Sequence, residues 1–251
     1  MTFWRDVFAW FTTSANWQGV DGIPRRLWEH VALSGSAVLI AVVLALPLAL
    51  VLGHLGRGGF LAVNVTNVGR AVPSFAILVI AQQITRDIGT KPAMIALVAL
   101  AIPPILTNTY VGMRAVDEEL RESARGMGMT GRQVLTQVEA PLAAPVIMAG
   151  IRTAAVQVVA TATLAALIAG GGLGRFIIDG FAQQDNVKAF GGAVLVALLA
   201  VVTELTLGFV QRRVTPGGRV EERPVVAEVG PAGGVAALPA RAVQAVLPAR
   251  P

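Results

Sequence analysis

Polar side chains occur inside several long apolar runs of this 251-residue chain, where they are costly to bury. Arg70 follows Asn67 at helical spacing within one run, and Glu204 is a carboxylate in the middle of another. Such groups by default face a bundle interior or a water-filled path, so Asn67, Arg70 and Glu204 are candidates for lining a path through a membrane. The alternative is structural: an ion pair between Arg70 and Glu204, or an arginine whose head reaches the membrane surface.

The same residues are poorly arranged for catalysis. A membrane-embedded enzyme needs a nucleophile with a base, or paired carboxylates, at matched depth. His30 and His54 lie at opposite ends of the first apolar run, and Glu204 has no acidic partner in another run. The chain also lacks cysteine, which excludes thiolate chemistry. We therefore expect no catalytic residue, no metal site and no cofactor in this chain, with a membrane enzyme as the weaker alternative.

Two glycine patterns resemble nucleotide-binding motifs only superficially. Gly126, Gly128 and Gly131 form G-x-G-x-x-G, but a charged stretch precedes them instead of a buried strand. The Gly-Gly-Gly-Leu-Gly segment at 170–174 lacks the G-K-[ST] of a P-loop. Any nucleotide must be bound by another subunit, and we expect segment 170–174 to form an outer loop or re-entrant turn.

The longest polar segment, 114–144, has the pattern of a helix, a turn and a second helix. Asp117 is placed to cap a helix that begins with two glutamates and ends with Arg125 and Gly126, as the helix dipole favours. Thr130 and Gln133 have capping-box spacing, and Pro141 is expected to end the second helix. The segment is predicted to fold just outside the membrane.

The elements that position these groups are apolar helices. The chain is 55% hydrophobic and 14% charged, with a mean hydropathy of +0.68, whereas soluble domains carry roughly 25% charged residues. Five stretches approach or exceed the ~20 residues needed to cross a bilayer, namely 31–52, 60–84, 92–113, 146–169 and 188–210. Since backbone polar groups must be paired within lipid, all five are predicted to be helices of an all-α membrane protein. The arginines that give the net charge of +5 are scattered singly, which disfavours nucleic acid as a partner.

The segments on either side of the predicted transmembrane domain, residues 31–212, differ from it in composition. Residues 1–30 hold all four tryptophans, which predicts a segment at the level of the lipid headgroups; no signal peptide is expected. Residues 213–251 are rich in proline and lack aromatic residues, which predicts a disordered tail. The distribution of Lys and Arg slightly favours an outside N-terminus and an inside C-terminus.

The polar segment resembles a loop motif of ABC importer permeases, E-A-A, three residues, G, nine residues, I-x-L-P. Here it reads Glu122-Ser123-Ala124, three residues, Gly128, nine residues and Val138-Glu139-Ala140-Pro141. The resemblance implies a type I importer permease (MetI-like) fold whose loop, a cytoplasmic coupling helix, contacts an ABC ATPase subunit. The implied contact residues are Glu122, Ser123, Ala124, Gly128, Val138 and Pro141.

The resemblance also implies partner proteins and a location in the cell. The ATPase subunit would carry ATP and Mg, an extracellular solute-binding protein would deliver the solute, and a second permease copy or sister permease would complete the path. The location would be a bacterial cytoplasmic membrane. A non-transporting scaffold that keeps the ATPase contact remains an alternative.

Three further segments resemble the glycine betaine/carnitine/choline (osmoprotectant) branch: 71–76 (AVPSFA), 106–112 (LTNTYVG) and 169–177 (AGGGLGRFI). The first two contribute the further path candidates Pro73, Ser74, Asn108 and Tyr110. The implied solute is a quaternary-ammonium osmoprotectant, with an amino-acid importer as the main rival. Because such a cation usually takes an aromatic cage and the spans contain a single Tyr, Tyr110, and no Trp, selectivity is expected to reside in the binding protein.

Overall fold

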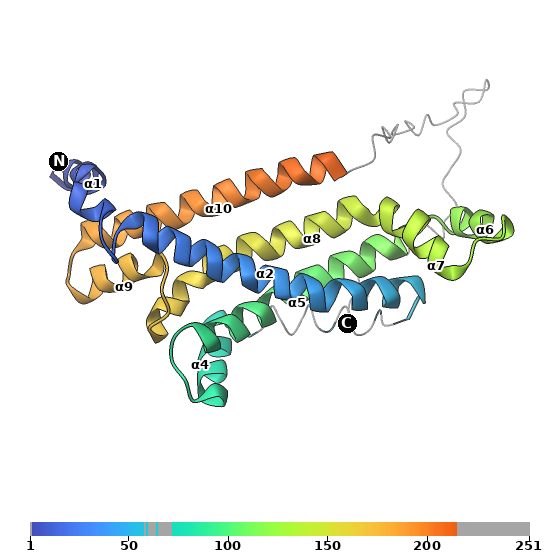
Figure 1. The fold of residues 1–251 in the computed structure, drawn as a ribbon, viewed down its shortest axis with the longest axis horizontal. Coiled ribbons are helices and arrows are strands. Elements are labelled where there is room, and N and C mark those ends of the chain that lie inside the picture. Colours follow the sequence, from blue (N-terminus) through green and yellow to red (C-terminus); the bar gives the residue numbers. More distant parts are fainter. Residues whose placement is uncertain (1, 58, 60–63, 65–71, 215–251) are drawn as a thin grey trace, which may run out of the picture. The chain divides into compact units, whose positions relative to one another are not determined.

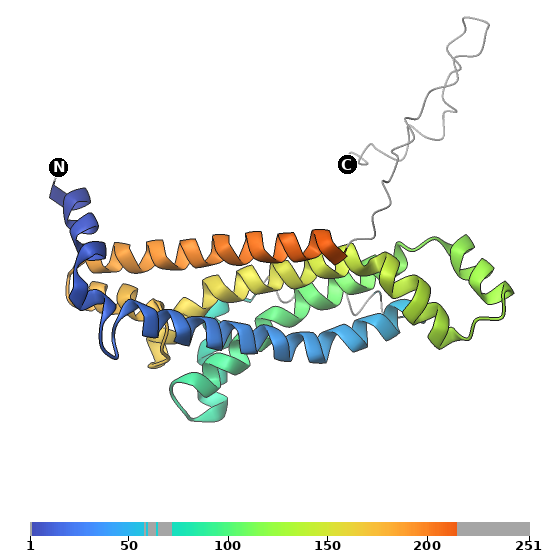
Figure 2. The same cartoon turned by 45° about the horizontal axis from the view of Figure 1, so that its top comes forward.

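The computed structural model describes residues 2–57, 59, 64 and 72–214, which all lie in the unit Met1–Pro216. The described residues form helices and no strand. Four helical stretches are long and apolar enough to cross a membrane: α2 (Ile23–His54), α5 (Thr90–Arg114), the stretch Gly131–Ile168 that contains α8 (Ala140–Thr161), and α10 (Asn186–Val214). They run side by side in both views (Figures 1 and 2). The predicted all-α membrane fold is confirmed.

The second predicted span, 60–84, is described only in part. Its C-terminal part forms α4 (Ser74–Thr85), whose 12 residues reach about 18 Å and are too short to cross a bilayer alone. Pro73 begins this helix, since its carbonyl accepts hydrogen bonds from the backbone N–H groups of Ala76 and Ile77. The candidates Asn67 and Arg70 and the predicted tail from 215 onward lie outside the described residues.

Small residues allow the spanning helices to approach closely. Ala37, Ala41, Ala45 and Ala49 follow one another at four-residue spacing on α2, and all are buried against α5 and its neighbours. Glycines make three further contacts: a Cβ at Gly53 would lie 2.5 Å from Met113, one at Gly112 would lie 2.9 Å from Val146, and one at Gly150 would lie 2.6 Å from Asn108. The centre of the bundle, α2–α5–α8, is therefore held by backbone-level packing.

The fourth span starts earlier than its sequence pattern predicts. We expected Pro141 to end the second helix of the polar segment, and this is wrong: α7 (Gly131–Gln133), a π-helical turn (Val134–Glu139) and α8 form one continuous stretch. Pro141 lies in the first turn of α8, directly after the π turn. A wider π turn accommodates the missing N–H and the bulk of the proline ring, which would otherwise interrupt an α-helix.

The two ends of the bundle carry different elements. At one end lie α6 (Glu118–Gly126) and α7; at the other lie α1 (Thr2–Thr12), a 3₁₀ turn (Ser14–Trp17) and α9 (Gly174–Ala182) (Figure 1). Helix α1 crosses the end of the bundle instead of running along it (Figure 2). Trp10 holds α1 against the bundle. Its ring packs edge-on against that of Phe176, with 5.6 Å between the ring centroids, and covers Gly191 of α10. Helix α2 begins eight residues before the apolar run, with Pro24 in its first turn.

Candidate functional site

The polar segment folds into two capped helices, as its sequence predicts. The Asp117 carboxylate accepts a hydrogen bond from the backbone N–H of Glu119 at 3.0 Å and so caps α6. Thr130 and Gln133 form a reciprocal capping box at the start of α7. Between the helices, Gly128 has a φ of +86°, a conformation that residues with a Cβ rarely adopt. We call α6, α7 and this turn the hairpin.

The six residues predicted to contact an ATPase fall into two groups. Glu122, Ser123, Gly128 and Pro141 are exposed, whereas Ala124 of α6 is buried and Val138 of the following π turn is half-buried. Only the exposed group is available to a partner. Sequence reasoning missed two exposed apolar residues of the hairpin, Leu120 and Met127, which are 49% and 77% exposed. The signal was available, since Leu120 lies within a strongly polar helix and Met127 directly follows it.

A buried ionic cluster lies under the hairpin. The Nε atom of Arg121 is 3.0 Å from Oε1 of Glu139, and Oε2 of Glu139 is 2.5 Å from Nδ1 of His54. Arg121 also donates to the Met113 carbonyl at the end of α5 and to Glu118. The Glu139 side chain is fully buried and Arg121 is 3% exposed. We did not foresee this cluster, because its members come from four elements and no sequence pattern links them.

A second polar cluster joins α8 to α10. The guanidinium of Arg152 pairs with Glu204 at 3.1 Å and donates to Gln211 at 3.0 Å, and Gln211 donates to the Pro145 carbonyl at 2.9 Å. Gly208 leaves room for this arginine, since a Cβ there would lie 3.4 Å from Nη1. Glu204 therefore forms an ion pair with Arg152, whereas the alternative pair with Arg70 lies outside the described residues.

The other described path candidates are dispersed. Asn108 lies where α5 meets α8 and donates to the Pro104 carbonyl of its own helix at 2.8 Å. Tyr110 packs against the core that α2 shares with α5. Pro73 is exposed, and Ser74 borders a narrow gap between α4, α5 and the 3₁₀ turn (Ala162–Ile168) that follows α8. The structure therefore does not gather these four residues into a single site.

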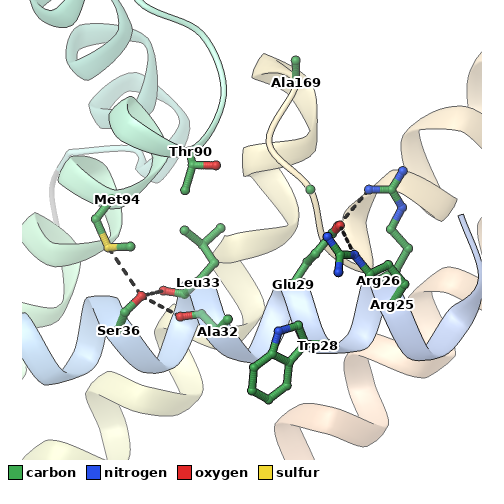
Figure 3. A pocket seen from close by; sticks show the side chains of 11 residues that line it. Arg25, Arg26, Trp28, Glu29, Ala32, Leu33, Ser36, Thr90, Met94 and Ala169 are labelled. Carbon is green, nitrogen blue, oxygen red and sulfur yellow. Dashed lines mark hydrogen bonds and ion pairs between the residues drawn. The ribbon is translucent and has the colours of Figure 1, made fainter. Parts of the chain in front are cut away.

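The end of the bundle opposite the hairpin carries a cavity of about 560 Å³ (Figure 3). It lies between α2, α5 and the segment 169–174, which we call the glycine segment. Glu29 lies on its wall, but Arg25, Arg26 and the backbone N–H of Gly172 all contact this carboxylate. Trp28 is the only aromatic residue among those lining the cavity. One exposed indole and an already paired carboxylate do not make an aromatic cage for a cation. Within the described residues, no cluster of three His, Asp or Glu could hold a metal ion.

The glycine segment forms a tight turn beside this cavity. His30, which is 1% exposed, links the segment to two helices: its Nδ1 accepts from the backbone N–H of Leu173 at 3.2 Å, and its Nε2 lies 2.9 Å from the Val159 carbonyl. This pattern requires a neutral imidazole with the proton on Nε2. A Cβ at Gly174 would lie 2.3 Å from the Thr163 carbonyl, so the glycine is needed for the close approach.

Comparison with known proteins assigns most of the chain to one family. Residues 9–216 match the family described as "Binding-protein-dependent transport system inner membrane component". The choline transport system permease protein OpuBB of Bacillus subtilis (strain 168) is 41% identical over 193 residues, covering 77% of this chain and 88% of that protein. The carnitine transport permease protein OpuCB of Listeria monocytogenes is 43% identical over 198 residues, covering 79% of this chain and 90% of that protein. A chain of the inward-facing MetNI methionine ABC transporter superposes with a TM-score of 0.67 at 23% identity, over 77% of this chain and 96% of that chain, and so shares the fold.

Proposed function

Because this chain belongs to the family of binding-protein-dependent transport system inner membrane components, we propose that it is the permease subunit of an ATP-driven importer for a quaternary-ammonium osmoprotectant such as glycine betaine, choline or carnitine. The observation that carries the proposal is the identity of 40–43% to permeases named for these solutes, which spans nearly the full length of each. The rival amino-acid importer is supported only by a fold likeness at 21–23% identity.

The hairpin is the proposed contact for a separate ATPase subunit, which would carry ATP and Mg and perform hydrolysis. Its exposed surface combines the carboxylate of Glu122 with the apolar side chains of Leu120 and Met127. Exposed apolar side chains contribute affinity to a protein interface, and a complementary charge contributes register. This assignment puts the hairpin and the C-terminus in the bacterial cytoplasm and the N-terminus outside.

Two further partners are proposed at the membrane. A second permease copy or a sister permease would pack on this chain to complete the path, because the described path candidates are dispersed in a single chain. Helix α1 would lie at the outer lipid surface, since it crosses the end of the bundle and exposes Trp4 and Phe8 (Figure 2).

Solute selectivity is assigned to an extracellular binding protein. The cavity beside Glu29 offers one indole and no free carboxylate, so the permease would provide a path of low affinity (Figure 3). The test is uptake into liposomes that contain the permease, its ATPase and its binding protein, with ATP supplied on the ATPase side. We expect uptake of labelled glycine betaine, choline or carnitine and none of methionine or histidine. Uptake of an amino acid with no response to the three osmolytes would refute the proposed solute.

A further inference from the structure

Glu139 lies where four elements meet at the base of the hairpin. It belongs to the π turn before α8, it contacts His54 in the last turn of α2, and it pairs with Arg121 of α6. Arg121 in turn binds the Met113 carbonyl in the last turns of α5. Through two side chains, the hairpin is therefore joined to three membrane-spanning stretches at the same level.

The buried ionic contacts differ in kind from the apolar contacts around them. Met113, Val116, Ala143 and Ile147 form an apolar cluster at the same level, and such contacts are non-directional, so helices can slide along them. A charge pair that is excluded from water cannot separate without leaving both charges uncompensated. Of the two, only the ionic contact fixes the position of α6 relative to α2, α5 and α8.

We propose that Arg121, Glu139 and His54 are positioning residues that make the hairpin and the adjoining ends of α2, α5 and α8 move as one body. This inference rests on the proposed function of the hairpin as the ATPase contact. A displacement of α6 by the ATPase would then reach the spanning helices instead of being absorbed at the base of the hairpin. The π turn that carries Glu139 is consistent with this role, because π turns inside helices often mark functional positions.

The test measures coupling in the full complex of permease, ATPase and binding protein in liposomes, as solute molecules moved per ATP hydrolysed. The first variant is Glu139→Gln, which keeps the shape of the side chain but removes the buried anion of Arg121 and leaves it only the exposed Glu118. We expect the ATPase to co-purify at wild-type yield, ATP hydrolysis to continue, and the ratio of solute to ATP to fall about tenfold. Stimulation of hydrolysis by the loaded binding protein should be lost as well.

The second variant, Arg121→Met with Glu139→Met, separates positioning from stability. Replacing both members of a buried ion pair with apolar residues commonly restores stability. We expect wild-type thermal stability with the ratio of solute to ATP still about tenfold low, because apolar contacts do not fix one geometry. Full coupling in this stable double variant would overturn the proposal, as would the failure of both variants to assemble, since the cluster would then serve folding alone.

Asp87→Asn is the matched control. Asp87 pairs with Lys91 in an exposed contact at the far end of the bundle, so the same change of carboxylate to amide should leave the ratio within twofold of wild type. Failure of the proposed function has a different signature: the wild-type permease would neither retain the ATPase nor transport any osmolyte. Wild-type transport with an unchanged ratio in Glu139→Gln would contradict only the positioning role.

Discussion

The Nε atom of Arg152 on α8 lies 3.1 Å from Oε1 of Glu204 on α10, and the two side chains are 34% and 44% exposed. Helix α10 is apolar on nearly all faces and buries few residues in this chain. The Arg152 cluster is therefore a main polar link between α10 and the bundle.

Removal of either member of this pair should destabilise the protein moderately. We expect Arg152→Ala and Glu204→Ala each to lower the free energy of unfolding by about 1 kcal/mol, because both side chains are partly exposed. The double variant should lose less free energy of unfolding than the two single variants together, with an interaction energy of at least about 0.5 kcal/mol. Thermal denaturation in detergent measures this, with the exposed Arg212→Ala as the control. Additive losses would show that the two residues act separately, as path residues would.

The hairpin should be sensitive to a bulky substitution at Gly128 in its turn and insensitive to substitution at the nearby Gly126. We expect Gly128→Val to reduce transport at least tenfold, because φ is +86° there, while insertion into the membrane stays normal. Gly128→Asn should keep most activity, since Asn tolerates this conformation. Gly126→Ala is the control, because open space surrounds it and it lies within α6. Equal transport in Gly128→Val and Gly126→Ala would show that the shape of the turn is unimportant.

A charge reversal on the exposed face of α6 should release the ATPase. Glu122→Lys places a cation where the proposed partner presents a complementary charge, a change that costs several kcal/mol, on the order of 2–5. We expect the permease to be inserted normally and the ATPase to be lost during affinity purification. Retention of the ATPase at wild-type yield with full uptake would remove Glu122 from the proposed interface.

The buried imidazole of His30 should stabilise the glycine segment. We expect His30→Ala to lower the free energy of unfolding by about 2–4 kcal/mol, because it opens a cavity and leaves the Leu173 N–H unpaired. Hydrogen exchange measured by mass spectrometry should then rise in segment 169–174 and remain unchanged in the hairpin at the other end. Unchanged protection of 169–174 would show that the segment is held by its packing alone.

Helix α1 should place its exposed aromatic residues in lipid. In a variant that keeps Trp4 as the only tryptophan, we expect its fluorescence to be quenched by lipids brominated near the headgroup. The matched variant that keeps only Trp10 should be quenched less, because that ring packs on Phe176 and Gly191. Equal quenching of both residues, or none of Trp4, would contradict an interfacial position for α1.

The sequence by itself determined the features that depend on neighbours along the chain. The apolar runs predicted the four long helices because a span depends on length and composition. The caps at Asp117 and Thr130 were predictable because each bonds within three residues of itself. The turn at Gly128 follows from the same local rules.

Only the tertiary structure decided which distant residues meet. His30 reaches a carbonyl 129 positions away and His54 reaches a carboxylate 85 positions away, so their partners depend on how the helices pack. The packing of α8 on α10 places Arg152 next to Glu204, a contact that no sequence pattern indicated. Pro141 was expected to end a helix, but the π turn before it keeps the stretch continuous. Periodicity reports which face of a helix is buried, and it carries no information on which helix covers that face.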